Sequence, residues 1–249
     1  MAPVSQPPKV SWSSLRAKLA AEWVPGEHVT IVGPTGSGKT HFAVSLAELC
    51  KYVLVLAAKR QDPLVSDLQA HGYIVTRDLA EIQWTADRDG GPLEPVHRRI
   101  VYWPSSPEKL NPQQLIAAHT RAFGGALDWA DKSGKWCLIV DETLYLADHL
   151  RLQRELDHVW FQGRSQKLSV IACAQRPSRV PRLAFSSASY LLLAQTNDAG
   201  DLERLREISA GFPRGMIDDA VQSLDYDAHE FLFVSTRDKG LARVIAPPR

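Results

Sequence analysis

The residues with the clearest chemistry are 33–40, which read GPTGSGKT and match the pattern G-x-x-x-x-G-K-[ST] at every fixed position. In this pattern the glycines leave backbone N–H groups free to surround a phosphate, the lysine adds a positive charge, and the last hydroxyl can bind Mg²⁺. The apolar run VTIV comes directly before the motif, and apolar residues at helical spacing follow it over 42–49. A strand therefore leads into the loop, and a helix starts there with its positive end facing the anion. We expect a site for a nucleoside triphosphate.

The motif also assigns individual roles. Lys39 is expected to bind the β- and γ-phosphates during catalysis, and the hydroxyl of Thr40 is expected to bind the metal ion. The sequence contains no Asn-Lys-x-Asp element that could read a guanine base. The expected cofactors are therefore ATP and Mg²⁺. The expected nucleotide-binding residues are Gly33, Pro34, Thr35, Gly36, Ser37, Gly38, Lys39, Thr40 and His41.

Two acidic residues, Asp141 and Glu142, directly follow the apolar run WCLIV at 136–140. A parallel strand that ends in an acidic residue places the carboxylate at the carboxyl edge of the sheet, where nucleotides bind. We expect Asp141 to hold Mg²⁺ through water and Glu142 to orient and deprotonate the attacking water. The plainer alternative is a solvated acidic pair at the end of a strand.

Gln175 directly follows another apolar run, SVIACA at 169–174. In a parallel sheet this strand also ends near the γ-phosphate, so the neutral amide could sense whether that phosphate is present. Without the other motifs, a glutamine in a loop is more often merely solvated.

The remaining sequence predicts the elements that position these residues. Short apolar, β-branched runs indicate strands, and the residues between several of them have helical spacing. This alternation is typical of an α/β fold with a doubly wound, mostly parallel sheet. Strands are also expected at 51–57, 72–76, 99–103 and 190–194, helices at 11–21 and 112–129, a loop at 85–95, and a C-terminal antiparallel hairpin at 231–245 on the sheet edge.

The 249 residues divide into an N-terminal arm with a short helix (1–27) and one large domain (28–249). A composition of 45% hydrophobic and 23% charged residues suits a well-buried core, and the net charge of +1 gives no global signature of a nucleic-acid binder. The three cysteines lie in apolar runs without metal-type spacing, so we expect reduced core thiols. No secretion signal and no apolar stretch of membrane-spanning length is visible. We expect a cytoplasmic protein without membrane insertion.

Together the motifs GPTGSGKT, LIVDE, the pair Gly163-Arg164 and AQRPSRVP resemble the FtsK/HerA superfamily of DNA-pumping ATPases, which includes small viral and phage packaging ATPases. The resemblance covers about residues 28–195. It implies a P-loop NTPase of the ASCE/RecA-like type, with residues 28–249 as the motor domain. It also implies that Gln175 senses the γ-phosphate and that Arg164, at the start of its strand, reaches into a neighbouring subunit as a catalytic residue.

The resemblance further implies a ring-shaped homo-oligomer, a hexamer, that moves duplex DNA through its centre. The chain has no N-terminal barrel, membrane segment or C-terminal winged-helix module, which favours a bare packaging motor with a capsid or portal protein as partner. Such a motor would work in the cytoplasm of a bacterium or a virus-infected cell, or with the virion. The family's Ala-Thr-Gln-Arg-Pro reads CAQRP here, with Ala174 in the threonine position.

Two clusters of positive charge could bind DNA phosphates or a neighbouring subunit. Arg176, Arg179 and Arg182 form one, and residues 97–99 form the other. Either cluster could also be an ordinary solvated surface, and the polar loop 85–95 could line a pore or be a surface excursion. Two other functions remain open: a nucleotide-dependent assembly or secretion ATPase with a protein partner, and a small-molecule kinase, which would not need the acidic pair or the Gln175 motif.

Overall fold

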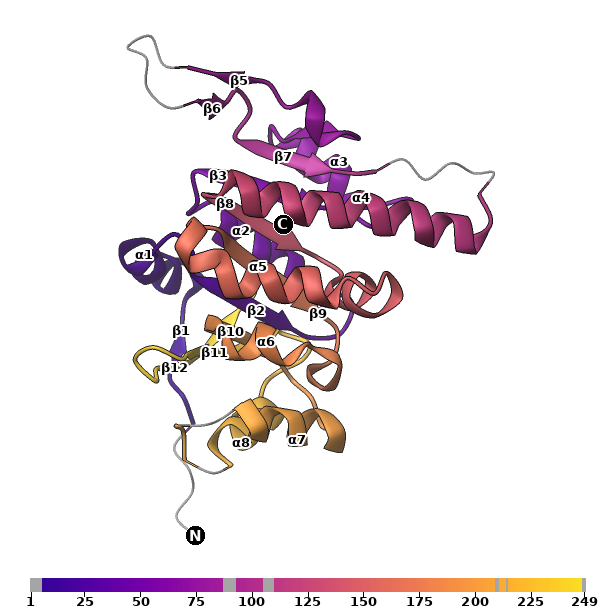
Figure 1. Cartoon of the computed structure of the whole chain (residues 1–249). Coiled ribbons are helices and arrows are strands. Elements are labelled where there is room, and N and C mark those ends of the chain that lie inside the picture. Colours follow the sequence, from indigo (N-terminus) through magenta and orange to yellow (C-terminus); the bar gives the residue numbers. More distant parts are fainter. Residues whose placement is uncertain (1–5, 87–92, 105–109, 209–210, 214, 248–249) are drawn as a thin grey trace.

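A ten-stranded sheet forms the centre of the protein (Figure 1). The computed structural model describes residues 6–86, 93–104, 110–208, 211–213 and 215–247. The strand order is β1-β12-β11-β10-β2-β9-β8-β3-β7-β4. The strands are β1 (Lys9–Val10), β2 (His28–Val32), β3 (Tyr52–Leu56), β4 (Ile74–Thr76), β7 (Arg99–Tyr102), β8 (Trp136–Val140), β9 (Ser169–Ala174), β10 (Ala188–Ala194), β11 (Glu230–Ser235) and β12 (Leu241–Ile245).

The seven strands from β10 to β4 are parallel, β11 is antiparallel to both β10 and β12, and β1 pairs parallel with β12. The register pairs Val32 of β2 with Ala174 of β9, and Val140 of β8 with both Ala172 of β9 and Leu56 of β3. The four strands therefore end at one edge, where the loops that follow them meet. The predicted α/β fold with a C-terminal antiparallel hairpin is confirmed.

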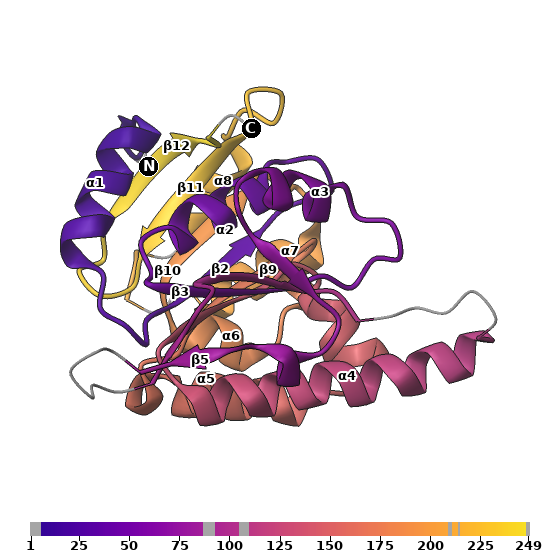
Figure 2. The same ribbon diagram turned by 90° about the horizontal axis from the view of Figure 1, so that it is seen from above.

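Helices cover both faces of the sheet (Figure 2). Alternate strand residues point to opposite faces, so Leu54 and Leu56 join one hydrophobic cluster while Val53 and Val55 join the other. On one face lie α1 (Trp12–Glu22), α2 (Lys39–Ala47) and α3 (Pro63–Ala70). On the other lie α4 (Pro112–Ser133), α5 (Gln153–Gln166) and α6 (Arg182–Ser186).

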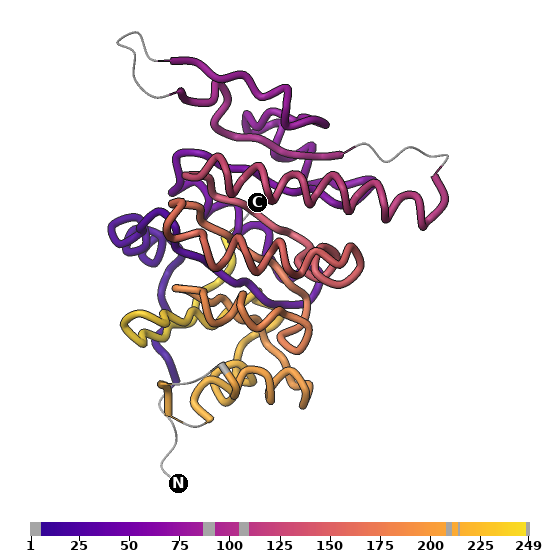
Figure 3. Tube along the Cα trace, viewed as in Figure 1, coloured from indigo at the N-terminus to yellow at the C-terminus, as the bar shows by residue number. Residues whose placement is uncertain are grey.

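Shorter elements complete the chain. Figure 3 traces it from β10 through α7 (Ala199–Ile208) and α8 (Met216–Gln222) to β11. The 3₁₀ turns η1 (Leu79–Glu81) and η3 (Pro177–Arg179) and the π-helix η2 (Tyr145–His149) lie in connections. Among the described residues, none of the helices combines the length and apolar composition needed to cross a bilayer. The cysteines are free thiols, two of them buried and Cys50 half-buried.

The predicted helices at 11–21 and 112–129 are present with caps that the sequence provides. Ser11 accepts a hydrogen bond from the backbone N–H of Ser14 at 3.1 Å, which starts α1. Asn111 and Gln114 form a reciprocal capping box that starts α4.

The prediction of a loop over 85–95 is wrong at both ends. β5 (Trp84–Thr85) pairs antiparallel with β6 (Glu94–Pro95), while residues 87–92 lie outside the described part. The polar residues and Pro95 gave no indication of this pairing, and β5 also has an aromatic contact, since the Trp84 ring lies 6.3 Å from that of Trp129. The C-terminal hairpin is likewise not the outermost element, because β1 pairs with β12 beyond it.

A buried histidine joins α5 to the amino ends of β2 and β9. His28 Nδ1 accepts the backbone N–H of Val170 at 3.0 Å, so the proton is on Nε2, which lies 3.1 Å from the carbonyl of Trp160. Gly163 allows this approach, because a Cβ there would lie 2.5 Å from the imidazole. Burial lowers the pKa of His28 to about 4, against the opposing effect of the Trp160 hydrogen bond.

This histidine should make the fold sensitive to mild acid. In the unfolded chain His28 takes up a proton near pH 6.5, whereas in the folded chain it does so only near pH 4. The contribution of neutral His28 to the free energy of unfolding is therefore complete above pH 6.5 and is lost as the pH falls towards 4. Between pH 7 and pH 5 we expect His28 to account for a loss of about 2 kcal/mol in the free energy of unfolding. Denaturant titrations of wild type and His28→Asn at both pH values check this. An equal loss in the two proteins would refute it.

Candidate nucleotide-binding and hydrolysis site

The phosphate loop joins β2 to α2, as the motif predicts. Gly36 and Gly38 have φ values of 82° and 98°, a left-handed conformation that glycine adopts without steric cost. Gly38 is the N-cap of α2, so the helix starts at Lys39 with its positive end towards the loop. The Gly33 N–H donates to the carbonyl of Ala174 at 3.0 Å and ties the loop to the end of β9.

Lys39 folds back over this loop. Its Nζ donates to the Pro34 carbonyl at 2.8 Å. Burial lowers the pKa of Lys39, while the nearby Asp141 and Glu142 act in the opposite direction. A phosphate bound here would supply a further negative partner. Of the other predicted loop residues, Thr35 and Gly36 are exposed, Ser37 is buried, and Pro34 and His41 are half-buried.

Thr40 and Asp141 meet as the metal-site prediction requires. The Thr40 hydroxyl donates to Asp141 Oδ1 at 2.8 Å, although one residue starts α2 and the other follows β8. Asp141 is only 9% exposed. A hydroxyl and a carboxylate next to a phosphate loop are the oxygen donors that Mg²⁺ accepts while keeping most of its waters. The residues present therefore fit a magnesium ion.

Lys59 is a site residue that the sequence reasoning missed. Its Nζ lies 2.9 Å from Glu142 Oε1 and 3.5 Å from Asp141 Oδ2. Partial burial lowers its pKa, but the hydrogen bond to Glu142 and the charges of both carboxylates outweigh this and raise it. In the sequence Lys59 merely follows an apolar run; the structure adds that β3 is the parallel neighbour of β8, so that Lys59 and the acidic pair lie at the same edge.

Gln175 lies beside these charges. A pocket of about 360 Å³ is lined by Lys59, Glu142 and Gln175, together with residues of α4 and η2. On its far wall His119 Nδ1 lies 2.7 Å from the hydroxyl of Tyr145. The structure thus brings the predicted water-activating carboxylate and the predicted phosphate sensor to one cavity. π-Helical turns such as η2 are frequent at functional sites.

Arg164 does not lie in this site. It is in the last turn of α5 rather than at the start of a strand, which corrects the predicted placement. Its Cα is 2.8 Å from where a Cβ on Gly26 would be, so it lies at the amino end of β2. The phosphate loop begins at the other end of this strand, on the order of 15 Å away. Arg164 is exposed, and no ion pair or side-chain hydrogen bond is found for it within the described residues.

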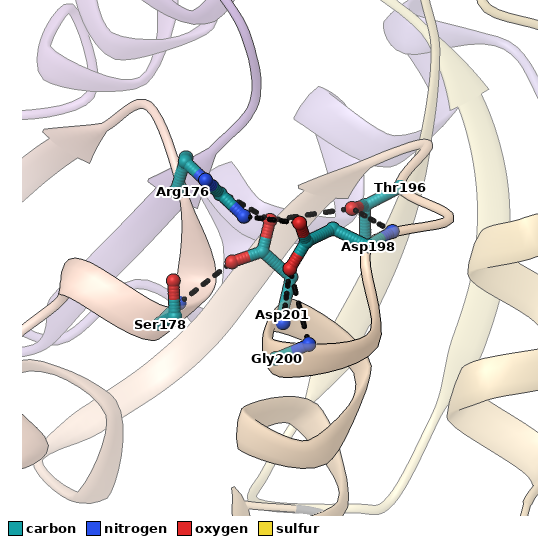
Figure 4. A network of polar contacts seen from close by, with 6 residues as sticks. All are labelled: Arg176, Ser178, Thr196, Asp198, Gly200 and Asp201. Carbon is teal, nitrogen blue, oxygen red and sulfur yellow. Dashed lines mark hydrogen bonds and ion pairs between the residues drawn. The ribbon is translucent and has the colours of Figure 1, made fainter.

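The predicted arginine cluster is partly neutralised within the chain. Arg176 pairs with Asp198 at 2.6 Å and with Asp201 at 3.2 Å (Figure 4). Arg182 lies 3.8 Å from Glu207 but is 83% exposed. Arg179 is exposed, with no ion pair among the described side chains.

The second predicted cluster is also engaged internally. Arg98 lies 3.7 Å from Glu94, and Arg99 donates to the backbone carbonyl of Lys51 at 3.0 Å.

Neither a protein-family model nor the sequence of a curated protein matches the chain. Solved structures do match. The genome packaging NTPase B204 from Sulfolobus turreted icosahedral virus 2, in complex with sulfate, aligns with a TM-score of 0.60 and 16% identity over 91% of this chain and 100% of B204. VirB4 of Thermoanaerobacter pseudethanolicus aligns with a TM-score of 0.60 and 14% identity over 89% of each chain.

TcpA, the pCW3 conjugation coupling protein, aligns with a TM-score of 0.51 and 12% identity over 92% of this chain and 60% of TcpA. The chain has the fold of the FtsK/HerA-type P-loop ATPases. The resemblance carried by the sequence motifs is thereby confirmed for the fold. At these identities the likeness concerns the fold alone, and function is argued from the site.

Replacing Lys59 should expose the repulsion between the two carboxylates. For Lys59→Met without Mg²⁺ we expect the free energy of unfolding to fall by about 1 kcal/mol, because the pair is half-exposed, which lowers Tm by about 2–4 °C. Added MgCl₂ should raise the Tm of this variant more than that of wild type, since the ion replaces the missing cation.

Lys132→Met is the matched control, because Lys132 pairs with Asp128 on the exposed surface of α4. It should show the wild-type response to MgCl₂. Equal magnesium shifts in Lys59→Met and wild type would contradict the role given to Lys59.

Proposed function

We propose that this protein hydrolyses ATP and uses the energy to move duplex DNA as a ring-shaped homo-oligomer, a hexamer. The observation that carries the proposal is the convergence of the phosphate loop, Asp141, Glu142 and Gln175 at one edge of the sheet. A kinase would need the loop but not this acidic pair beside a neutral sensor.

The chain's own residues divide the chemistry. The loop N–H groups and Lys39 would hold the β- and γ-phosphates, and Thr40 and Asp141 would hold the metal. When bound, Mg²⁺ would neutralise charge on the phosphate oxygens. Glu142 orients a water and accepts its proton, and Lys59 keeps that carboxylate aimed across the pocket. Gln175 donates its amide N–H to the γ-phosphate or the attacking water.

The choice of nucleic acid as cargo rests on analogy and on surface charge. Two of the matched proteins are described as a genome packaging NTPase and a conjugation coupling protein, and B204 was solved with ATP-γS and AMPPCP. By analogy, the docking partner would be a capsid or portal protein. Because the chain carries only one net positive charge, DNA must be held by local arginines repeated around a ring.

The ring is supported by what α5 leaves exposed. Arg164 is at the opposite edge of the sheet from the phosphate loop, as a head-to-tail contact requires if it is to act on a neighbour's nucleotide. Phe161, three residues earlier and thus on the same helix face, is 76% exposed. A large exposed ring beside an exposed arginine fits a subunit interface.

One observation favours an assembly or secretion ATPase with a protein partner. The charge of Arg176 is balanced inside the chain, which leaves fewer arginines for DNA than the sequence suggested. This is the second candidate.

Glu142→Gln should bind ATP and lose turnover, because the amide keeps the shape of the carboxylate but cannot accept a proton. The expected loss in kcat is about 10²–10⁴-fold. Lys39→Ala should instead lose nucleotide binding. Equilibrium binding of a fluorescent ATP analogue and steady-state hydrolysis separate the two effects. Hydrolysis by Glu142→Gln within about twofold of wild type would remove Glu142 from the assignment.

Arg164 should act across a subunit boundary. Arg164→Ala and Glu142→Gln, each inactive alone, should regain part of the ATPase activity when co-assembled, because a mixed interface can combine the intact half of each. An arginine supplied to a γ-phosphate is worth about 10³–10⁵ in rate, so the recovery should be easy to measure. If mixed rings form at every ratio without recovery, Arg164 does not act in trans.

The assembled protein should bind duplex DNA without sequence preference and hydrolyse ATP faster when it does. Replacing Arg179 and Arg182 with glutamine should flatten the dependence of log affinity on log salt, since each phosphate contact contributes about 0.9 to the slope. Titrations of labelled duplexes between about 50 and 200 mM salt measure this, with Lys132→Gln as control. An oligomer that ignores DNA at low salt would favour the protein-partner candidate.

A further inference from the structure

A buried carboxylate, Asp201, accepts hydrogen bonds from three donors, two of them in the segment 176–178 and one at Thr196 (Figure 4). It lies in the first turn of α7 and is only 3% exposed. Its Oδ2 accepts from Arg176 Nε at 3.2 Å and from the Thr196 hydroxyl at 3.3 Å, and its Oδ1 accepts the backbone N–H of Ser178 at 3.1 Å. Buried carboxylates cost free energy unless they are satisfied in this way.

Two of these donors flank the sensor loop. Arg176 is the residue directly after Gln175, and the Ser178 N–H belongs to η3, the turn that follows. One carboxylate therefore fixes both a side chain and a backbone group within three residues of Gln175. The position of the Gln175 amide relative to the pocket depends on this backbone.

The anchor is itself held firmly. Asp198 accepts the backbone N–H groups of Gly200 and Asp201 at 3.0 and 3.1 Å, which caps α7, and it also pairs with Arg176. Further along α7, Arg204 donates to the carbonyl of Val180 at 3.0 Å. The sensor loop and α7 thus form one connected unit.

We propose that Asp201 is a positioning residue for the ATPase reaction, which holds Gln175 at the γ-phosphate through Arg176 and the backbone of Ser178. The inference rests on the proposed function. It assigns to α7, which lies outside the nucleotide pocket, the task of fixing the sensor. Errors of about 1 Å in such positioning cost up to about 10² in rate.

Asp201→Asn in the full-length chain tests this, because the amide keeps the size of the side chain but cannot accept all three hydrogen bonds. We expect kcat to fall about tenfold or more, with the KM for ATP within about twofold of wild type. Glu203→Gln is the matched control, an acid-to-amide change on the same helix at an exposed residue without an ion pair or side-chain hydrogen bond among the described residues. It should keep wild-type kcat.

A double-mutant cycle separates positioning from a merely structural role. If Asp201 acts through Gln175, then Asp201→Asn combined with Gln175→Ala should have the same kcat as Gln175→Ala alone. Additive losses, or losses that follow only the fraction of folded protein in thermal unfolding, overturn the proposal. If Asp201→Asn does not fold, Arg176→Ala replaces it in the same cycle, because Arg176 is half-exposed.

The possible failures are distinguishable. A wild-type assembly without ATPase activity overturns the proposed function and this inference with it. If Gln175→Ala hydrolyses ATP normally, Asp201 has no sensor to position and the inference falls, while the ATPase assignment stands. An active wild type that needs Gln175, together with an Asp201→Asn variant at full kcat, overturns the inference alone.

Discussion

At the carboxyl edge of the sheet the charges of two lysines balance those of two carboxylates, and the arrangement of the candidate site depends on this balance. Lys39 and Lys59 face Asp141 and Glu142 where burial makes an uncompensated charge costly. Lys59 lies closer to Glu142 than to Asp141, so the carboxylate with the weaker ion pair is the one suited to the metal. When a metal binds Asp141 and a triphosphate binds Lys39, Glu142 can therefore keep its ion pair with Lys59.

This balance depends on parallel strand order. β9 lies between β2 and β8, and β8 lies between β9 and β3, so four loops distant in sequence meet at one edge. The same order separates the two ends of the molecule. The amino edge carries His28 beneath α5 and the exposed Arg164, whereas the carboxyl edge carries the phosphate loop, Asp141 and Glu142. A subunit with such different ends is suited to head-to-tail contacts, which form a ring when the rotation between subunits closes.

Sequence patterns predicted the sheet and the phosphate loop because both depend on local signals. Continuous apolar runs mark strands buried on both faces, and the loop needs its glycines in fixed order. Lys59 and Asp201 were missed for a common reason: each acts on a partner that only the strand order brings near. In a sequence, a lysine after a strand or an aspartate early in a helix is usually an ordinary surface residue, so neither position indicates a functional role. Arg164 was assigned to a strand because the sequence does not show that α5 continues past Gly163.

The phosphate loop is also supported from the side opposite to the sensor. A Cβ on Gly38 would lie 2.7 Å from the Cβ of Ala246, which follows β12, and Phe42 of α2 packs edge-on against Phe231 of β11 at 5.0 Å. The C-terminal hairpin is therefore part of the wall behind the loop. Gly33, in turn, is hydrogen-bonded to the end of β9, directly before Gln175. Any movement of the loop on nucleotide binding must therefore be transmitted to β9 or resisted by the hairpin. On the other side, α7 holds the Gln175 loop through Asp201 and Arg176, so the phosphate loop and the sensor are each supported by an element outside the nucleotide site.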